Sequence, residues 1–220
     1  SRGSNGVIII TTKKGRANQP LQISYAGSVT ASMKRKTVDV MNAGQYRDFI
    51  KSIWGEGSDA YKALGTANTN WQDEILRTAI GQDHNLTFSG AFGKGQNALP
   101  FRASVGYTNN NGIVKTSNFE RYTAALALNP TLLDNHLNIN LNVKGMYAKN
   151  RYADGGAIGA AVAYDPTQSV YDRTSVDAAN YGYYHAWRGA GLDPTEDPSW
   201  PSTLNTLATR NPVAIINLKD

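Results

Sequence analysis

The sequence predicts an all-β protein whose long antiparallel strands each carry one apolar and one polar face. Apolar and polar residues alternate in five segments, which is the pattern of strands with different surroundings on their two sides. The 12 Tyr and 21 Gly residues favour strands and turns over packed helices. Two long stretches, one after the first alternating segment and one after the fifth, predict large loops at one end of the strands.

A run of β-branched residues near the start of the 220-residue chain, Val7–Thr12, predicts a buried strand that ends at Lys13–Gly15. A glycine-containing turn over Arg2–Gly6 leads directly into it. A natural domain seldom begins one turn before a core strand, and no signal peptide precedes this one. We therefore expect these residues to be a piece of a longer protein.

The five alternating segments follow in order along the chain. In the last of them Leu137, Ile139 and Leu141 share one face, and asparagines occupy the other. The predicted strands are Leu21–Met33, His84–Phe92, Phe101–Tyr107, Tyr122–Leu128 and Leu137–Tyr147. Such alternation fits a soluble sandwich, which buries its apolar face, and also a membrane barrel, which turns that face to lipid.

Strand length and loop size favour the membrane barrel. The first and fifth segments are long enough to span a bilayer, which takes about 9–11 residues of a tilted strand. If the first strand runs outward, both long stretches lie outside, as in outer-membrane barrels. Aromatic residues gather near strand ends, where such barrels carry interfacial girdles: Tyr25, Phe92, Phe101, Tyr107, Tyr122 and Tyr147. A soluble β-sandwich binding module or surface adhesin is the alternative.

The long stretches contain helical patterns. Asn42 is a predicted N-cap for a helix over Ala43–Trp54, whose apolar residues recur at helical spacing. Asn70 is a predicted cap for a shorter helix, with Trp71, Ile75 and Ala79 on one face. A third helix is predicted over Ala157–Tyr164, before Asp165-Pro166. These helices either fold the loops onto themselves or contact a ligand.

Aromatic side chains of the long stretches are the candidate contacts for a ligand or a protein partner. Tyr and Trp rings stack on the apolar faces of sugars and also pack on protein surfaces. The alternative is that these rings hold the loops together. The candidates are Trp54, Trp71, Tyr183, Tyr184 and Trp187.

Several classes of function are excluded. The absence of Cys rules out disulfides, Cys-ligated metals and thiol nucleophiles. His84, His136 and His185 are isolated, and no phosphate-binding loop or nucleophile elbow occurs, so we predict no catalytic residue, no metal and no cofactor. The net charge of +5 is not accompanied by a nucleic-acid-binding motif, so we expect no nucleic-acid partner.

Five motifs, in the expected order, resemble one family. Ser1–Gly15 is similar to "GSRGANGVILITTKKG", which precedes the first barrel strand in SusC/RagA-type TonB-dependent outer-membrane transporters of Bacteroidetes. The only notable departure is Ser4, where Ala is usual. The segments that resemble the family's "TDWQDEIF", "HNLSVSGG", "GIIKNSDFKR" and "NPLA" are, in order, Asn70–Ile75, His84–Gly90, Gly112–Arg121 and Asn211–Ala214.

The resemblance implies a part of a plugged, 22-stranded transmembrane β-barrel with antiparallel strands and long extracellular loops that carry short helices. Residues 1–15 would be the C-terminal end of the plug domain, with Arg2, Gly3 and Gly6 in the structural turn between plug and barrel. Residues 16–149 would form the first barrel strands, with a long loop at about 34–83. Residues 150–220 would be an extracellular loop region that leads toward the next strands.

The resemblance also implies a function for the parent protein. It would import large nutrients, foremost oligosaccharides and sometimes peptides, across the outer membrane of a Gram-negative bacterium. TonB would transmit the energy through a segment that is not in this chain, and a SusD-like surface lipoprotein would be the second protein partner. Outer-membrane lipid would surround the strands, and the chain would not be an enzyme.

Overall fold

The computed structural model describes residues 13, 16, 19–93, 98–133, 136–175, 178–187 and 208–218. The strand predicted at 7–12 and the turn with Arg2, Gly3 and Gly6 lie outside these residues. The chain divides into two compact units. We call Ser1–Thr30, Gly81–Asn110 and Phe119–Asn150 the sheet unit, and Ala31–Ile80, Asn111–Asn118 and Arg151–Asp220 the helical unit.

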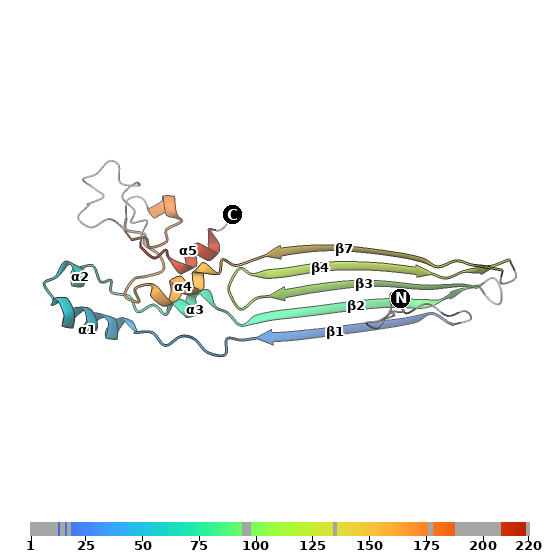
Figure 1. The fold of residues 1–220 in the computed structure, drawn as a ribbon, viewed down its shortest axis with the longest axis horizontal. Coiled ribbons are helices and arrows are strands. Elements are labelled where there is room, and N and C mark those ends of the chain that lie inside the picture. The colour runs from blue at the N-terminus through green and yellow to red at the C-terminus, as the bar shows by residue number, and fades with distance from the viewer. Residues whose placement is uncertain are drawn as a thin grey trace, which may run out of the picture. The chain divides into compact units, whose positions relative to one another are not determined.

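The sheet unit is built on a five-stranded sheet with the order β1-β2-β3-β4-β7 (Figure 1). Its strands are β1 (Gln22–Ser32), β2 (Ala79–Phe92), β3 (Leu99–Asn111), β4 (Asn118–Leu128) and β7 (Leu141–Arg151). β2 and β3 are antiparallel, in a register that runs from Gly81 opposite Asn110 to Phe92 opposite Leu99. A separate two-stranded ladder joins β5 (Thr131–Leu132) to β6 (Leu137–Asn138).

The structure confirms the mostly antiparallel sheet and all five predicted strands, with different ends. β2 begins at Ala79 rather than at residue 84, because backbone pairing continues through polar residues that break the alternation. The fifth strand begins at Leu141, since Leu137 and Asn138 pair within the β5–β6 ladder instead. Closure into a 22-stranded barrel stays a prediction.

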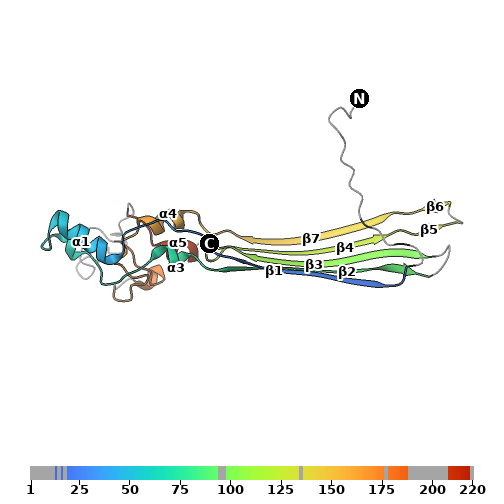
Figure 2. The ribbon, with the colours of Figure 1, turned by 90° about the horizontal axis from the view of Figure 1, so that it is seen from below.

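The large sheet is a single layer when it is seen nearly edge-on (Figure 2). A β-sandwich requires two sheets that pack face to face. Among the described residues, the only companion of the five-stranded sheet is the short β5–β6 ladder. This part of the chain therefore lacks the second sheet that a sandwich would need.

The edge strands of the sheet are exposed along their whole length. Every residue of β1 and of β7 is solvent-accessible, including apolar ones such as Val29, which is 72% exposed. Unpaired strand edges and apolar faces are unfavourable in water. The sheet therefore requires further strands or an apolar environment to complete it.

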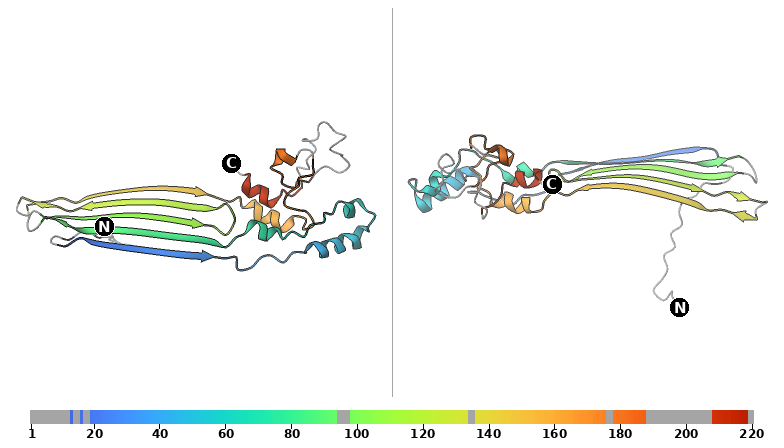
Figure 3. Two further views of the ribbon diagram at one scale, coloured as in Figure 1. Left: turned by 180° about the vertical axis from the view of Figure 1, so that it is seen from behind. Right: turned by 90° about the horizontal axis from the view of Figure 1, so that it is seen from above.

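The helical unit has its own apolar core. Its helices are α1 (Ala43–Trp54), α2 (Asp59–Lys62), α3 (Trp71–Ile75), α4 (Gly156–Ala163) and α5 (Pro212–Asn217), with a 3₁₀ turn at Ala178–Tyr181. α3, α4 and α5 lie side by side (Figure 3). The core residues between them are Trp71, Ile75, Ala157, Ala161, Tyr164, Val213 and Ile216. No helix in the described part of the chain combines the length and apolar character that crossing a bilayer demands.

The predicted helix caps are present. Asn42 Oδ1 accepts from Gln45 N at 3.0 Å and Asn42 N donates to Gln45 Oε1 at 3.0 Å, which is a reciprocal capping box at the start of α1. Asn70 caps α3 through Asp73 N. That helix ends at Ile75 and not at Ala79 as predicted, because Leu76 is extended and pairs with Val114. The sequence did not indicate α2 or α5.

Candidate functional site

Two distant loop segments are joined by main-chain hydrogen bonds in the helical unit. Ala67 N donates to Thr167 O at 2.9 Å, and Thr69 N donates to Pro166 O at 2.8 Å. Gly65 N donates to the buried hydroxyl of Thr167 at 2.9 Å. The loop after β1 and the loop after β7 therefore fold together as one structure.

Trp71 lies at the centre of this structure. Its side chain is 2% exposed, and its indole Nε1 donates to Asp165 O at 2.9 Å. Its ring meets the ring of Tyr164 edge-on, with 4.6 Å between centroids. Aromatic pairs prefer this geometry, and the buried indole N–H has the partner that it needs.

Residues 33–42 connect β1 to α1 without regular secondary structure, and we call this segment the strap. Gln72 holds it from α3: Val38 N donates to Gln72 Oε1 at 2.9 Å, and Gln72 Nε2 donates to Val38 O at 2.7 Å. An ion pair between Lys34 and Asp73 adds a second attachment. The side-chain amide thus satisfies both main-chain groups of one strap residue.

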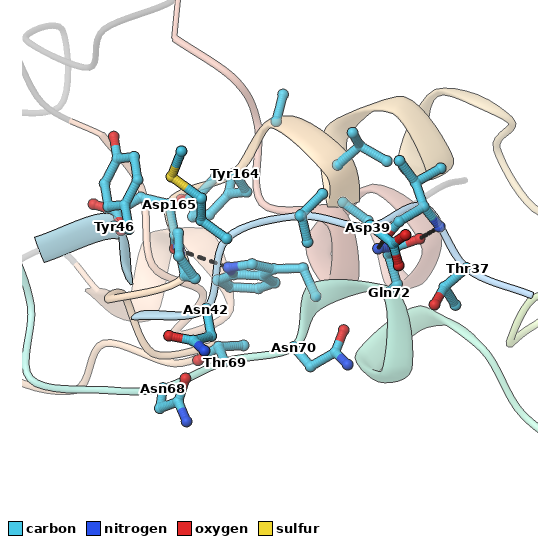
Figure 4. Close-up of a pocket in the computed structure, with 18 residues that line it drawn as sticks. Thr37, Asp39, Asn42, Tyr46, Asn68, Thr69, Asn70, Gln72, Tyr164 and Asp165 are labelled. Carbon is cyan, nitrogen blue, oxygen red and sulfur yellow. Dashed lines mark hydrogen bonds between the residues drawn. The ribbon is translucent and has the colours of Figure 1, made fainter. Parts of the chain in front are cut away.

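A pocket of about 720 Å³ lies between the strap, α1, α3 and the end of α4 (Figure 4). Its size is in the range of small-molecule sites. Figure 4 shows Thr37 and Asp39 near Gln72 at one end and Tyr46 near Asp165 at the other. The lining residues are Thr37–Asn42, Tyr46, Asn68–Gln72 and Ala161–Pro166.

The polar side chains of the pocket differ in how many hydrogen bonds they already make within the protein. Asp165 accepts from Thr167 N at 2.7 Å and from Gln168 Nε2 at 3.4 Å. Asn68 Oδ1 accepts from Ala43 N at 3.3 Å, and its amide N–H groups have no partner among the residues that the structure describes. Burial raises the pKa of Tyr46, and the charge of Asp165 adds to this, so the hydroxyl stays a neutral hydrogen-bonding group.

The rings of His185 and Trp187 lie against Tyr164. The Tyr164 hydroxyl is 2.8 Å from His185 Nδ1, and Trp187 packs 6.1 Å from the Tyr164 ring and 5.3 Å from the imidazole. Burial raises the pKa of Tyr164, and the negative charge of Asp165 raises it further. These contacts hold His185 and Trp187, in the loop after β7, against the core of the helical unit.

The five predicted contact residues do not form one constellation. Trp71 lines the pocket, although it exposes little surface there. Trp54 is 55% exposed at the end of α1, away from the pocket lining. Tyr184 lies 5.2 Å from the Tyr171 ring, and Trp187 packs against the core.

The last predicted contact, Tyr183, is 47% exposed and has a positive φ of 61°. The Arg173 guanidinium lies 6.0 Å above its ring. Sequence reasoning missed Asp39, Tyr46 and Asn68 as pocket residues. Asn42 and Asn70, which also line the pocket, did have a detectable signal, but that signal indicated helix caps rather than ligand contacts.

Comparison with known proteins identifies the family. No family model matches the chain. TonB-dependent receptor SusC of Bacteroides thetaiotaomicron is 46% identical over 222 aligned residues, covering 100% of this chain and 21% of that protein. The chain belongs to the SusC/RagA family of TonB-dependent receptors. A TonB-dependent receptor of Formosa agariphila is 35% identical over 123 residues, which cover 56% of the chain and 11% of that receptor.

Solved structures support the fold of this SusC/RagA segment. The RagAB peptide importer in its "open-open" state matches with a TM-score of 0.53 and 23% identity, over 70% of this chain and 20% of that one. Its "closed-closed" state matches with a TM-score of 0.53 and 22% identity, over 69% and 20%. The chain thus spans about a fifth of the length of these relatives. They bear the names of receptors and importers rather than of enzymes.

Proposed function

We propose that this chain is part of an outer-membrane transporter that imports large nutrients into the periplasm with energy transmitted by TonB. The main support for this proposal is the 46% sequence identity to SusC over the whole chain. Oligosaccharides are the first ligand class to test, because amide and hydroxyl side chains surround the pocket of the helical unit. Peptides are the second, because the RagAB structures are those of a peptide importer.

Each region has a proposed role in the transporter. Residues 1–15 end the plug, and residues 16–149 supply the first barrel strands and the loop at about 34–83. The exposed apolar side chains of β1 and β7 support contact with lipid and with further strands. Residues 150–220 form a loop region on the extracellular side. Contacts with a ligand or partner are proposed for Trp54 and Trp71 in the loop at about 34–83, and for Tyr183, Tyr184 and Trp187 in residues 150–220.

Two proteins are proposed to work with the transporter. A SusD-like surface lipoprotein would cover its extracellular side, and TonB would act from the periplasm. The pairing of components in the name of the RagAB importer is consistent with a two-protein assembly. The proposed location of the chain is the outer membrane of a Gram-negative bacterium.

The test is uptake by cells that produce the full-length protein. We expect it in the outer-membrane fraction, extracted only with detergent and together with a lipoprotein. A fluorescent oligosaccharide should enter the periplasm, and deletion of TonB should abolish its entry while leaving the receptor in the membrane. Recovery of the full-length protein as a soluble, folded monomer would contradict the proposal.

A further inference from the structure

We propose that the pocket beneath the strap accepts neutral saccharide units and rejects acidic ones, and that Asp39 sets this selectivity. The inference rests on the proposed function and assigns it a site and a class of substrate. It depends on three features of the pocket: its charge, its free hydrogen-bonding groups and the engagement of the strap backbone.

The lining of the pocket carries two carboxylates, those of Asp39 and Asp165, and no Lys, Arg or His. The nearby cations are engaged elsewhere or lie outside the lining. Lys34 pairs with Asp73, and the Arg47 guanidinium donates to Gly65 O and Ala67 O. Arg35 and Lys36 are exposed on the strap before the first lining residue. A negatively charged ligand in this pocket would therefore meet like charges, which is unfavourable.

The two carboxylates differ in their availability. Asp165 is buried and is held by Thr167 N and Gln168 Nε2. Asp39 is exposed, and no partner for its carboxylate occurs in the described part of the chain. Asp39 is thus the carboxylate that can accept hydrogen bonds from ligand hydroxyls.

The remaining polar groups match a polyhydroxylated ligand. The hydroxyls of Thr37 and Tyr46 can both donate and accept, and the N–H groups of the Asn68 amide have no partner in the described part of the chain. Sugar hydroxyls also donate and accept, so each can pair with one of these groups. The partly exposed side chains of Val40 and Met41 provide apolar surface along the same wall.

A peptide fits the pocket less well. An extended peptide is commonly bound by pairing its backbone with an exposed strand. The strap is the pocket wall whose backbone a peptide would pair with, but Gln72 occupies both main-chain groups of Val38 at its centre. The site therefore offers side-chain groups rather than a backbone edge.

The test is equilibrium binding to the full-length receptor in detergent, by isothermal titration. The probes are maltohexaose, cellohexaose, mannohexaose, the acidic hexagalacturonate and a neutral hexapeptide. We expect at least one neutral hexasaccharide to bind and hexagalacturonate not to bind. Asp39→Asn should weaken binding of the neutral sugar about tenfold, because its hydrogen bonds to a charged carboxylate become weaker bonds to a neutral amide. The difference in affinity between neutral and acidic sugars should also become smaller, because one negative charge is removed from the lining.

Tyr46→Phe should weaken the neutral sugar by a smaller factor, since it removes one neutral hydroxyl. Asp48→Asn is the matched control, because Asp48 is an exposed carboxylate of α1 outside the lining. It should bind like wild type, and thermal unfolding should be unchanged in all three variants.

Three results would overturn the inference, and they differ in what else they overturn. If the neutral sugar binds and Asp39→Asn and Tyr46→Phe behave like Asp48→Asn, the pocket is not the site, while oligosaccharide import stands. If hexagalacturonate binds more tightly than every neutral probe, the charge selectivity is wrong. If no saccharide binds, or only the peptide does, oligosaccharide import fails together with the site.

Discussion

The helical unit and the sheet unit differ in what covers their apolar side chains. In the helical unit, Ile75 is 1% exposed within a core shared by α3, α4 and α5. In the sheet unit, Ile23 on β1 is 63% exposed. An isoleucine is therefore buried by residues of its own unit in the first case and is exposed on the surface of its unit in the second.

The two units therefore obtain their stability from different interactions. Burial of a large apolar side chain contributes about 1.5–3 kcal/mol, and the helical unit obtains this from contacts within itself. The sheet unit obtains its order from inter-strand hydrogen bonds and needs lipid or further strands to cover its faces. Substitutions of one residue type in both units should therefore have unequal effects.

The largest effect is expected for Trp71→Ala. The change removes the buried indole, its hydrogen bond to Asp165 O and its contact with Tyr164, and should cost the helical unit about 3–5 kcal/mol of unfolding free energy. Hydrogen exchange of the full-length protein would measure it as lost protection in α3 and α4. Trp54→Ala, at an exposed position, is the control and should leave that protection intact.

A matched pair of isoleucines tests the comparison directly. Ile75→Ala should destabilise the helical unit by about 2–5 kcal/mol, because it leaves a cavity among buried neighbours. Ile23→Ala in the detergent-solubilised receptor should cost less than about 1 kcal/mol, because fluid surroundings refill the space. Equal losses of thermal stability in the two variants would show that β1 is packed against protein.

A smaller effect is expected where the strap is held. Gln72→Ala removes both hydrogen bonds to Val38 and should cost about 1–3 kcal/mol locally. Hydrogen exchange should show the Val38 amide losing protection, while that of β2 is unchanged. Gln22→Ala, on the exposed β1, is the control. Unchanged protection of Val38 in Gln72→Ala would mean that other contacts hold the strap.

The smallest effect appears only in alkali. Burial holds the pKa of Tyr164 above the value of about 10 that it has in the unfolded chain, so the folded helical unit binds this proton more tightly. The resulting stability is complete below pH about 10 and is lost as the pH rises toward the folded pKa. Tyr164→Phe should flatten the alkaline decline in helical-unit stability, whereas Tyr25→Phe, in the sheet unit, should not.

The outcomes of the sequence predictions depend on whether a feature is set by neighbouring or by distant residues. The alternation of apolar and polar residues along a strand is a local property of the sequence. The presence of five strands could therefore be predicted, and these are β1, β2, β3, β4 and β7. The caps at Asn42 and Asn70 are also local, because each side chain bonds a backbone N–H three residues away. The end of α3 was not predictable, because Leu76 leaves the helix to pair with Val114.

By itself, the sequence determined the antiparallel strands, their two-sided character and the family, because periodicity, capping and ordered motifs are written in neighbouring residues. Only the tertiary structure decided that Trp71 is a core residue and that Asp39, Tyr46 and Asn68 line one pocket. The physical reason is that this pocket is closed by contacts between segments about a hundred residues apart, such as Thr69 with Pro166. No local pattern records which distant backbone groups will pair.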